Sequence, residues 1–366
     1  MKPFLIVLSV IGGFILLLVL TAFTYLAPNP DYVLDYMLEN PDKSSLYLVR
    51  NDSVLADLNS NRKSPLASTM KIVVAITYAE QAAAAELDPE EDIALSDLDR
   101  FYLANTDGNA HPAWLKEIQR LGKEKDGTVK LKEVAAGMIQ YSSNANTDFL
   151  IWKLGLDKIN ANLDRLDLTP HDKIFPPVGS LMVPLAFPEW KESGQLNAKI
   201  RDMGQEAFGK VAAEFHQRLR TEEVNQLKAD FRKVSLDHDF QYIWSNYLPG
   251  SSPQVYASLM KKLNSKTYFS ETVHKFLDPV MERLMSNPAN QQWLQHAGMK
   301  GGSTLWVLTK ASYATDKSGN TIELAYFFNN LSLLSSQRLQ QSMNAFELEI
   351  LTSPAFRAKL NEKLGN

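Results

Sequence analysis

Three short polar motifs follow one another along this chain of 366 residues, and they constrain its fold more than any other feature. Ser68-Thr69-Met70-Lys71 comes first, Ser142-Ser143-Asn144 second and Lys300-Gly301-Gly302-Ser303 third. These motifs contain the residue types that acyl transfer requires when a serine is the nucleophile and a lysine is its base. A fold that uses them together must bring three distant segments into one cleft.

The first motif stands at the start of an apolar segment. Loop-forming residues precede Ser68, and the run from Ile72 to Gln81 is compatible with a helix, so Ser68 is predicted to open a buried helix. Lys71 lies one turn later on the same face, where its amine can reach the Ser68 hydroxyl. The apolar flank excludes water from this amine and favours its neutral form. The free N–H group of Ser68 can then face a developing oxyanion.

A second copy of the first motif weakens the argument from that string alone, because short motifs recur by chance. Ser258-Leu259-Met260-Lys261 lies in residues 253–263, which follow a Ser-Ser-Pro start and have the spacing of an amphipathic helix. We interpret this copy as structural.

The second motif lies between two helical patterns, one ending near Tyr141 and the other starting near Asn146. A short polar elbow at this point can present the Ser142 hydroxyl as a proton relay and the Asn144 amide as a substrate contact. The alternative interpretation is a polar turn in which Asn144 or Asn146 caps the second helix. The local sequence leaves both interpretations open.

The third motif precedes a predicted hairpin with strands at 303–314 and 321–328. Its two glycines let a substrate lie against the strand edge, where the Ser303 N–H group can be a second oxyanion donor. Lys300 supplies a fixed positive charge. A rival string, Lys317-Ser318-Gly319, falls at the hairpin tip and is interpreted as a solvated turn.

In this order the three motifs resemble the Ser-x-x-Lys, Ser-x-Asn and Lys-Thr-Gly boxes of the penicillin-recognising serine enzymes, and most closely those of class A β-lactamases. Residues 46–60 also resemble the hairpin that precedes the nucleophile in that family. The resemblance covers roughly residues 43–185 and 250–355. It implies an α+β fold of the β-lactamase/transpeptidase type, with a five-stranded antiparallel sheet from the two chain ends, flanking helices and an all-helical region from the middle.

The resemblance also implies a role for each motif residue. Ser68 would be the acylated nucleophile, Lys71 its base and Ser142 the proton relay. The N–H groups of Ser68 and Ser303 would form the oxyanion hole. The implied substrate-binding residues are Asn144, Lys300, Gly302 and Ser303. No cofactor is implied, and the six scattered histidines show no metal-ligand spacing.

The largest departure from the family pattern is a missing Glu-x-x-Leu-Asn loop, whose glutamate drives water onto the acyl-enzyme. The corresponding residues 168–182 contain no such motif. His171, Asp172, Glu189 and Glu192 are nearby candidates for the water-activating group, but we interpret all four as structural or solvated.

Two smaller departures lie inside the boxes. Gly301 stands where the family has a hydroxyl residue, which removes one contact to a substrate carboxylate. Ser143 stands where class A enzymes commonly have an acid, a position that supports the loop without taking part in the chemistry.

The N-terminus predicts a single membrane span. Residues 4–26 carry no charged side chain, and a segment of this length can cross a bilayer as a helix. A convincing signal-peptide cleavage site is missing. Lys2 precedes the segment and acidic residues follow it, so the body is expected outside the cytoplasm. We predict an anchor at 1–30 and a hydrolase domain at 31–366.

Two segments outside the motifs stand near the predicted cleft. Residues 190–248 have helical spacing and form an expected insertion, which either caps the cleft, meets a partner or elaborates the surface. Residues 101–114 are expected at the cleft rim, where Tyr102 or Trp114 either stacks on substrate or packs inward.

These features predict an enzyme with a small-molecule or peptide substrate. The first expectation is a membrane-anchored serine hydrolase that opens a β-lactam ring or a related amide or ester. The alternatives are a D-alanyl carboxypeptidase or esterase acting on cell-wall peptides, and a slowly deacylating β-lactam sensor. The net charge of -4 and the absence of basic clusters argue against nucleic acid as a partner.

Overall fold

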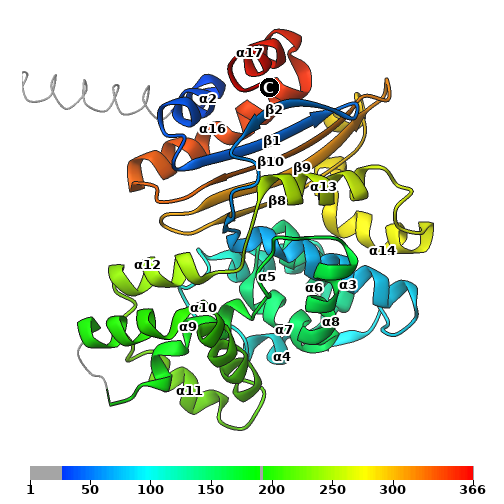
Figure 1. Ribbon diagram of the computed structural model, residues 1–366. Coiled ribbons are helices and arrows are strands. Elements are labelled where there is room, and N and C mark those ends of the chain that lie inside the picture. The colour runs from blue at the N-terminus through cyan, green and yellow to red at the C-terminus, as the bar shows by residue number, and fades with distance from the viewer. Residues whose placement is uncertain (1–26, 190–192, 366) are drawn as a thin grey trace, which may run out of the picture.

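The computed structural model describes residues 27–189 and 193–365 and shows a five-stranded antiparallel sheet built from both ends of the chain (Figure 1). The strand order is β2-β1-β10-β9-β8, with β8 at one edge. The predicted sheet and the early hairpin are therefore confirmed. The first strand of the late hairpin begins at Leu308 and not at residue 303, because Ser303 ends the separate strand β8. The strands are β1 (Ser44–Arg50), β2 (Ser53–Leu58), β8 (Leu294–Ser303), β9 (Leu308–Asp316) and β10 (Thr321–Phe328).

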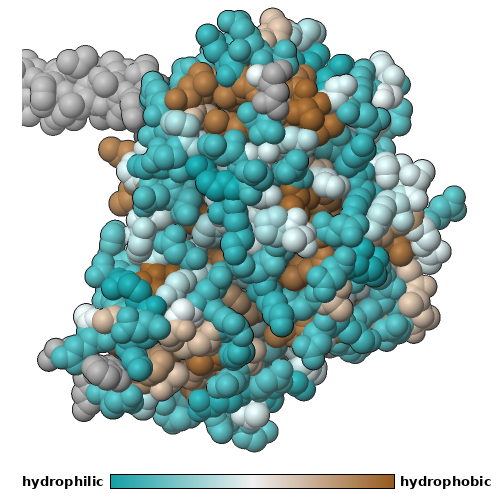
Figure 2. All heavy atoms as spheres, in the orientation of Figure 1, coloured by the Kyte–Doolittle hydropathy of each residue, from teal (hydrophilic) through white to brown (hydrophobic). Residues whose placement is uncertain are grey.

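Helices cover both faces of the sheet because successive strand residues point to opposite sides. Leu324 and Tyr326 belong to a buried cluster with α2 (Pro30–Glu39), α16 (Leu333–Thr352) and α17 (Pro354–Leu364). Ala325 and Phe327 belong to the other cluster, with α13 (Pro253–Asn264) and α14 (Glu271–Met281). Figure 2 shows hydrophilic side chains over most of the visible face, with hydrophobic ones gathered near α17.

An all-helical region lies below the sheet in Figure 1. Its central helix is α3 (Lys71–Ala83), which is buried along most of its length because its sequence is apolar on nearly every side. The other helices of this region are α4 (Leu95–Asp99), α5 (Ala110–Arg120), α6 (Leu131–Gln140), α7 (Asn144–Leu154), α8 (Leu156–Arg165) and α9 (Pro177–Leu181). Two short sheets accompany these helices. One pairs β3 (Ser64–Pro65) with β7 (Gly250–Ser251), and the other has the order β4 (Asp92–Ala94), β6 (Thr128–Lys130), β5 (Glu124–Lys125).

The segment predicted as an insertion consists, in its described part, of α10 (Ser193–Arg218), α11 (Val224–Phe231) and α12 (His238–Tyr247). Gly204 interrupts α10 with a φ of 75°, a backbone conformation that a glycine adopts without strain. α10 packs closely on α9, since a Cβ at Gly179 would lie 2.2 Å from the Ala212 carbonyl oxygen. The insertion is thus part of the packed helical region.

The two motif-like strings that we interpreted as structural, Ser258–Lys261 and Lys317–Gly319, lie away from the three motifs. Lys317 is exposed at the tip of the β9–β10 hairpin, and Gly319 beside it has a φ of 83°. Ser258 is exposed on α13, and Lys261 pairs with Asp52 at 2.7 Å. Both strings therefore have the structural roles that their sequence context indicates.

Within residues 27–189 and 193–365, no helix is both long and apolar enough to cross a bilayer. The predicted span at residues 4–26 lies outside the described residues. The anchor therefore stays a prediction from the sequence.

Candidate active site

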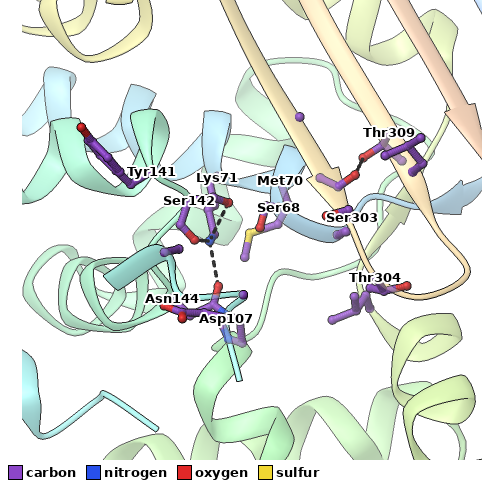
Figure 3. A pocket seen from close by; sticks show the side chains of 18 of the residues that line it. Ser68, Met70, Lys71, Asp107, Tyr141, Ser142, Asn144, Ser303, Thr304 and Thr309 are labelled. Carbon is purple, nitrogen blue, oxygen red and sulfur yellow. Dashed lines mark hydrogen bonds between the residues drawn. The ribbon is translucent and has the colours of Figure 1, made fainter. Parts of the chain in front are cut away.

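A cavity of about 930 Å³ lies between the helical region and the β8 edge of the sheet, and the three motifs meet there (Figure 3). Its lining includes Ser68, Lys71, Ser142, Asn144, Gly302 and Ser303. Lys300 joins this group through its ammonium, which lies 3.0 Å from the Ser142 hydroxyl oxygen. The structure thus brings together every residue that the sequence assigned to the site.

Ser68 lies in the single 3-10 turn Ala67–Met70, directly before α3. The helix itself begins at Lys71, three residues later than the sequence suggested. Ala67 has a φ of 46°, an uncommon conformation for a residue with a side chain, which is typical of strained functional turns. Thr309 of β9 fixes this turn to the sheet, because its hydroxyl donates to the Leu66 carbonyl oxygen at 2.8 Å.

Gly302 lets the edge strand approach the nucleophile turn more closely than any other residue would allow. A Cβ at this position would lie 2.5 Å from the Leu66 carbonyl oxygen and 2.6 Å from the Ser68 nitrogen. This approach sets the Ser303 end of β8 beside the Ser68 N–H group, as a shared oxyanion site requires.

We expect Gly302→Ala to reduce acylation of Ser68 by at least about tenfold and to destabilise the protein by about 1–3 kcal/mol, because the added methyl group overlaps backbone atoms. Gly301→Ala is the matched control, since its Cβ would meet only the Thr309 carbonyl oxygen, at 3.5 Å. Thermal unfolding and the acylation rate measure the two effects. Equal behaviour of the two variants would contradict the close approach.

The elbow between α6 and α7 presents Ser142 and Asn144. Ser142 has a φ of 66°, which turns the chain sharply between the two helices. The alternative in which Asn144 or Asn146 caps α7 is wrong: the hydroxyl of Ser143 caps this helix by accepting from the Asn146 N–H group at 3.2 Å. Because Ser143 caps the helix, the Asn144 amide is available to the site.

Lys71 is buried and donates hydrogen bonds to neutral oxygens. Its amine lies 2.7 Å from the Ser142 carbonyl oxygen, 2.8 Å from Asn144 Oδ1 and 3.4 Å from the Ser142 hydroxyl oxygen. Burial, and after it the charge of Lys300, lower the pKa of Lys71 well below its ordinary value of 10.5. A neutral amine beside a serine hydroxyl is the arrangement that a lysine base needs.

Ser142 is positioned between two amines. Lys300 donates to its hydroxyl oxygen at 3.0 Å and to the Gly301 carbonyl oxygen at 2.8 Å. Burial, followed by the charge of Lys310, lowers the pKa of Lys300 to about 7. The Ser142 hydroxyl can therefore exchange protons with Lys71 while Lys300 holds it in place.

The candidate water-activating groups do not face Ser68 in the described structure. Asp172 pairs with Lys63 at 2.7 Å and accepts from the Gly250 N–H group at 3.0 Å. His171 contacts the Tyr256 hydroxyl at 3.1 Å. Neither residue lines the cavity.

The two glutamate candidates give no alternative base. Glu189 is exposed and does not line the cavity, whereas Glu192 lies outside the described residues. Phe175 and Pro177 instead form part of the wall.

Asp107 is the single carboxylate among the described residues that line the cavity, and the sequence did not single it out. One of its oxygens accepts from the His111 N–H group at 2.9 Å, and the other is enclosed without a hydrogen-bond partner. The only sequence signal was its place in the predicted rim segment. In that segment Tyr102 and Trp114 pack inward against His111, with ring centroids 4.9 and 5.4 Å away.

Several other lining residues also escaped the sequence reading. They are Gln241, Trp244 and Ser245 of α12, Leu248 after it, Arg283 before β8 and Lys310 on β9. Arg283 stacks on Tyr141 with its guanidinium carbon 4.7 Å from the ring centroid. No motif marks these residues, because their place in the cavity follows from packing between distant segments.

Solved β-lactamases share this fold. One from Chitinophaga pinensis has a TM-score of 0.52 and 14% identity, covering 87% of this chain and 99% of its own. One from Sphaerobacter thermophilus has a TM-score of 0.51 and 16% identity, covering 87% and 96%. The extended-spectrum β-lactamase TLA-3 has a TM-score of 0.53 and 11% identity, covering 92% and 96%. At these identities the likeness establishes the fold alone.

The sequence itself establishes the family. No curated protein matches the chain. The model of the β-lactamase enzyme family, Beta-lactamase2, matches residues 31–288, which is more than half of the chain. Together with the fold and the meeting of a serine, a lysine base and a second serine in one cavity, this match shows that the protein is a serine hydrolase that belongs to the β-lactamase enzyme family.

Proposed function

We propose that this protein hydrolyses an amide or ester bond through an acyl-enzyme on Ser68, with a β-lactam ring or a related cell-wall peptide bond as substrate. The observation that carries the proposal is the buried amine of Lys71, which contacts oxygens of Ser142 and Asn144, has a lowered pKa and lines the same cavity as Ser68. An amine in this state accepts the Ser68 proton near neutral pH.

Each step of acylation has a group in place. Lys71 takes the hydroxyl proton as Ser68 Oγ attacks the substrate carbonyl carbon, and the N–H groups of Ser68 and Ser303 stabilise the resulting oxyanion. The proton then passes from Lys71 through the Ser142 hydroxyl to the leaving nitrogen or oxygen, and the scissile bond breaks. Water then attacks the acyl carbonyl carbon, the ester bond to Ser68 Oγ breaks, and a proton from the water returns to Ser68 Oγ as the carboxylic acid product leaves.

Two cations lie on the Ser142 side of the cavity, where the leaving group departs. Lys300 contacts Ser142, and Arg283 contacts Tyr141 next to it. Their charge favours a leaving group that carries a carboxylate, as both a penicillin and a peptide C-terminus do. Asn144 is placed to contact the amide on the acyl side.

A slowly deacylating penicillin-binding protein is the second candidate, and a specific observation favours it. The single lining carboxylate in the described structure, Asp107, has one oxygen enclosed and the other held by a backbone N–H group. The water that must attack the acyl-enzyme thus has no evident carboxylate base. The first two steps proceed as above, and the ester persists.

The sequence supports a location at the outer face of a membrane. Residues 4–26 are uncharged, and the charges around them favour an extracytoplasmic body. Cell-wall peptides and β-lactams are encountered in that compartment.

The acyl-enzyme can be tested by intact mass spectrometry of residues 31–366 after adding benzylpenicillin. We expect one adduct of the penicillin mass on the unchanged protein and none on Ser68→Ala, because the alanine has no hydroxyl to acylate. Ser258→Ala is the matched control and keeps the adduct. An adduct on Ser68→Ala, or none on the unchanged protein, would contradict acylation of Ser68 by this substrate.

A further inference from the structure

The insertion reaches the catalytic cavity through one helix. Trp244 of α12, Leu248 just after it and Phe175 before α9 lie in the same cavity lining as Ser68. Leu248 and Phe175 are 5% and 6% exposed, so both side chains are packed into the wall of the cavity. The insertion therefore contributes the apolar side chains of Trp244 and Leu248 to the site, beside the polar side chains of Gln241 and Ser245.

α12 also contacts the sheet on the other side of the cleft. Trp306, in the connection between β8 and β9, packs edge-on against two rings of α12, those of His238 at 4.7 Å and Tyr242 at 5.4 Å between centroids. This contact comes three residues after Ser303. An extended group that follows the β8 edge beyond Ser303 therefore meets α12 and Trp306.

The wall is anchored to the catalytic helix α7. Trp244 donates its indole N–H to the Ser180 hydroxyl of α9 at 2.8 Å. Asp148 of α7 accepts from the Val178 and Gly179 N–H groups of α9, at 3.2 and 3.3 Å. Because α7 also carries Asn144, these hydrogen bonds link the wall to an element of the catalytic site.

The side of the substrate that faces this wall follows from the proton path. Ser142 delivers the proton to the leaving atom, so the leaving group lies toward Ser142 and Lys300. The substituent on the other side of the carbonyl projects toward Ser303, where α12 contacts Trp306. That substituent is the part of the substrate that remains on Ser68 after acylation.

We infer that α12 is the specificity element for the acyl side of the substrate, with Trp244 as its principal contact, and that it selects a short aromatic or apolar acyl group. This inference rests on the proposed acylation of Ser68. Gln241 and Ser245 are the polar lining residues of α12, whereas Trp244, Phe175 and Leu248 offer an acyl chain no further polar partner. The contact between α12 and Trp306 obstructs a long acyl chain. An aryl ring instead buries its faces against the wall.

Two probes that differ only in the acyl group test the inference: benzylpenicillin, with a phenylacetyl group, and 6-acetamidopenicillanic acid, with an acetyl group. We expect the unchanged protein to be acylated at least about tenfold faster, per unit concentration, by the phenylacetyl probe. Trp244→Ala should bring this ratio close to one, by slowing the phenylacetyl probe alone. Trp244→Phe, which loses the hydrogen bond to Ser180 but keeps a ring, should keep most of the ratio.

Tyr268→Ala serves as the control, since Tyr268 is a 44% exposed aromatic residue outside the cavity lining. It should leave the ratio unchanged. All variants are checked for a cooperative thermal unfolding transition before rates are compared. A ratio near one in the unchanged protein, or a ratio that Trp244→Ala does not alter, would overturn the inference while leaving acylation of Ser68 intact.

A binding measurement separates the inference from the proposed chemistry. Saturation-transfer NMR with N-phenylacetylglycine and N-acetylglycine needs no acylation, and we expect only the phenylacetyl compound to bind, with loss of its signal in Trp244→Ala. Binding without acylation by either penicillin would support the wall and contradict the proposed substrate. Absence of binding by N-phenylacetylglycine would overturn the inference that α12 binds the acyl group.

Discussion

Changing Lys71 to arginine is expected to slow acylation of Ser68 by about two to four orders of magnitude, the usual contribution of a general base. A guanidinium stays protonated at every accessible pH and cannot accept the Ser68 proton. Lys71 can do so because burial, with the charge of Lys300 as a second cause, lowers its pKa well below 10.5. Acylation rates of both proteins, measured by rapid quenching and intact mass, give the size of the effect.

The pH dependence separates loss of the base from a change of shape. In the unchanged protein, acylation should fall as the pH is lowered through the reduced pKa of Lys71, because the protonated amine cannot act as a base. The residual rate of Lys71→Arg should lack this dependence. Lys71→Gln, which is shorter and neutral, should acylate as slowly as Lys71→Arg. This variant shows whether the loss comes from the missing base or from the larger size of arginine.

The second Ser-x-x-Lys string supplies the matched control for this experiment. Lys261 lies on the exposed side of α13 and pairs with Asp52 at 2.7 Å, outside the cavity lining. Lys261→Arg should acylate at the rate of the unchanged protein. A Lys71→Arg variant that retained more than a tenth of the rate would show that another group takes the serine proton.

The acyl-enzyme is expected to persist, with hydrolysis slower by about two to four orders of magnitude than in an enzyme that has a positioned carboxylate base. Phe175 and Pro177 form part of the cavity wall, and the single lining carboxylate among the described residues, Asp107, has one oxygen enclosed and the other bound to the His111 backbone N–H group. After excess penicillin is removed, the adduct should decay slowly in repeated mass spectra.

Asp107→Asn tests the remaining alternative. The change preserves the size of the side chain and an acceptor for the His111 N–H group, so we expect the decay of the adduct to stay within a few-fold of the unchanged rate. A hundredfold slower decay would identify Asp107 as the water-activating base. Rapid turnover in both proteins would show that a different group activates the water.

The sequence predicted the parts of the site that carry their own local signals. Ser68 precedes an apolar helical run, Ser142 lies at a break between two helical patterns, and Lys300 precedes a hairpin. Each signal fixes the local backbone, and the joint presence of the three chemistries indicates a shared cleft. The sheet topology followed from the family resemblance, because pairing between β1 and β10 has no local signature.

The rest depends on contacts between distant segments. The alternative interpretation of the elbow placed an asparagine at the cap of α7, but Ser143 takes that place, and its hydroxyl is also held by His111 at 3.0 Å in the buried interior. Trp244 faces the cavity only because α12 lies against Ser180 and the loop at Trp306. Helical periodicity alone shows that α12 has an apolar side, not which surface that side meets.

The pairing of β1 with β10 also has a consequence for the order in which the protein is made. β1 is complete at Arg50, whereas its inner partner β10 ends at Phe328, with Ser44 opposite Phe328. During synthesis the β1–β2 hairpin therefore exposes an unpaired strand edge until nearly the whole chain has emerged. Ser68 and Lys71 are made early, yet Lys300 and Ser303 reach them only with the last strands, so the nascent chain has no complete catalytic cavity.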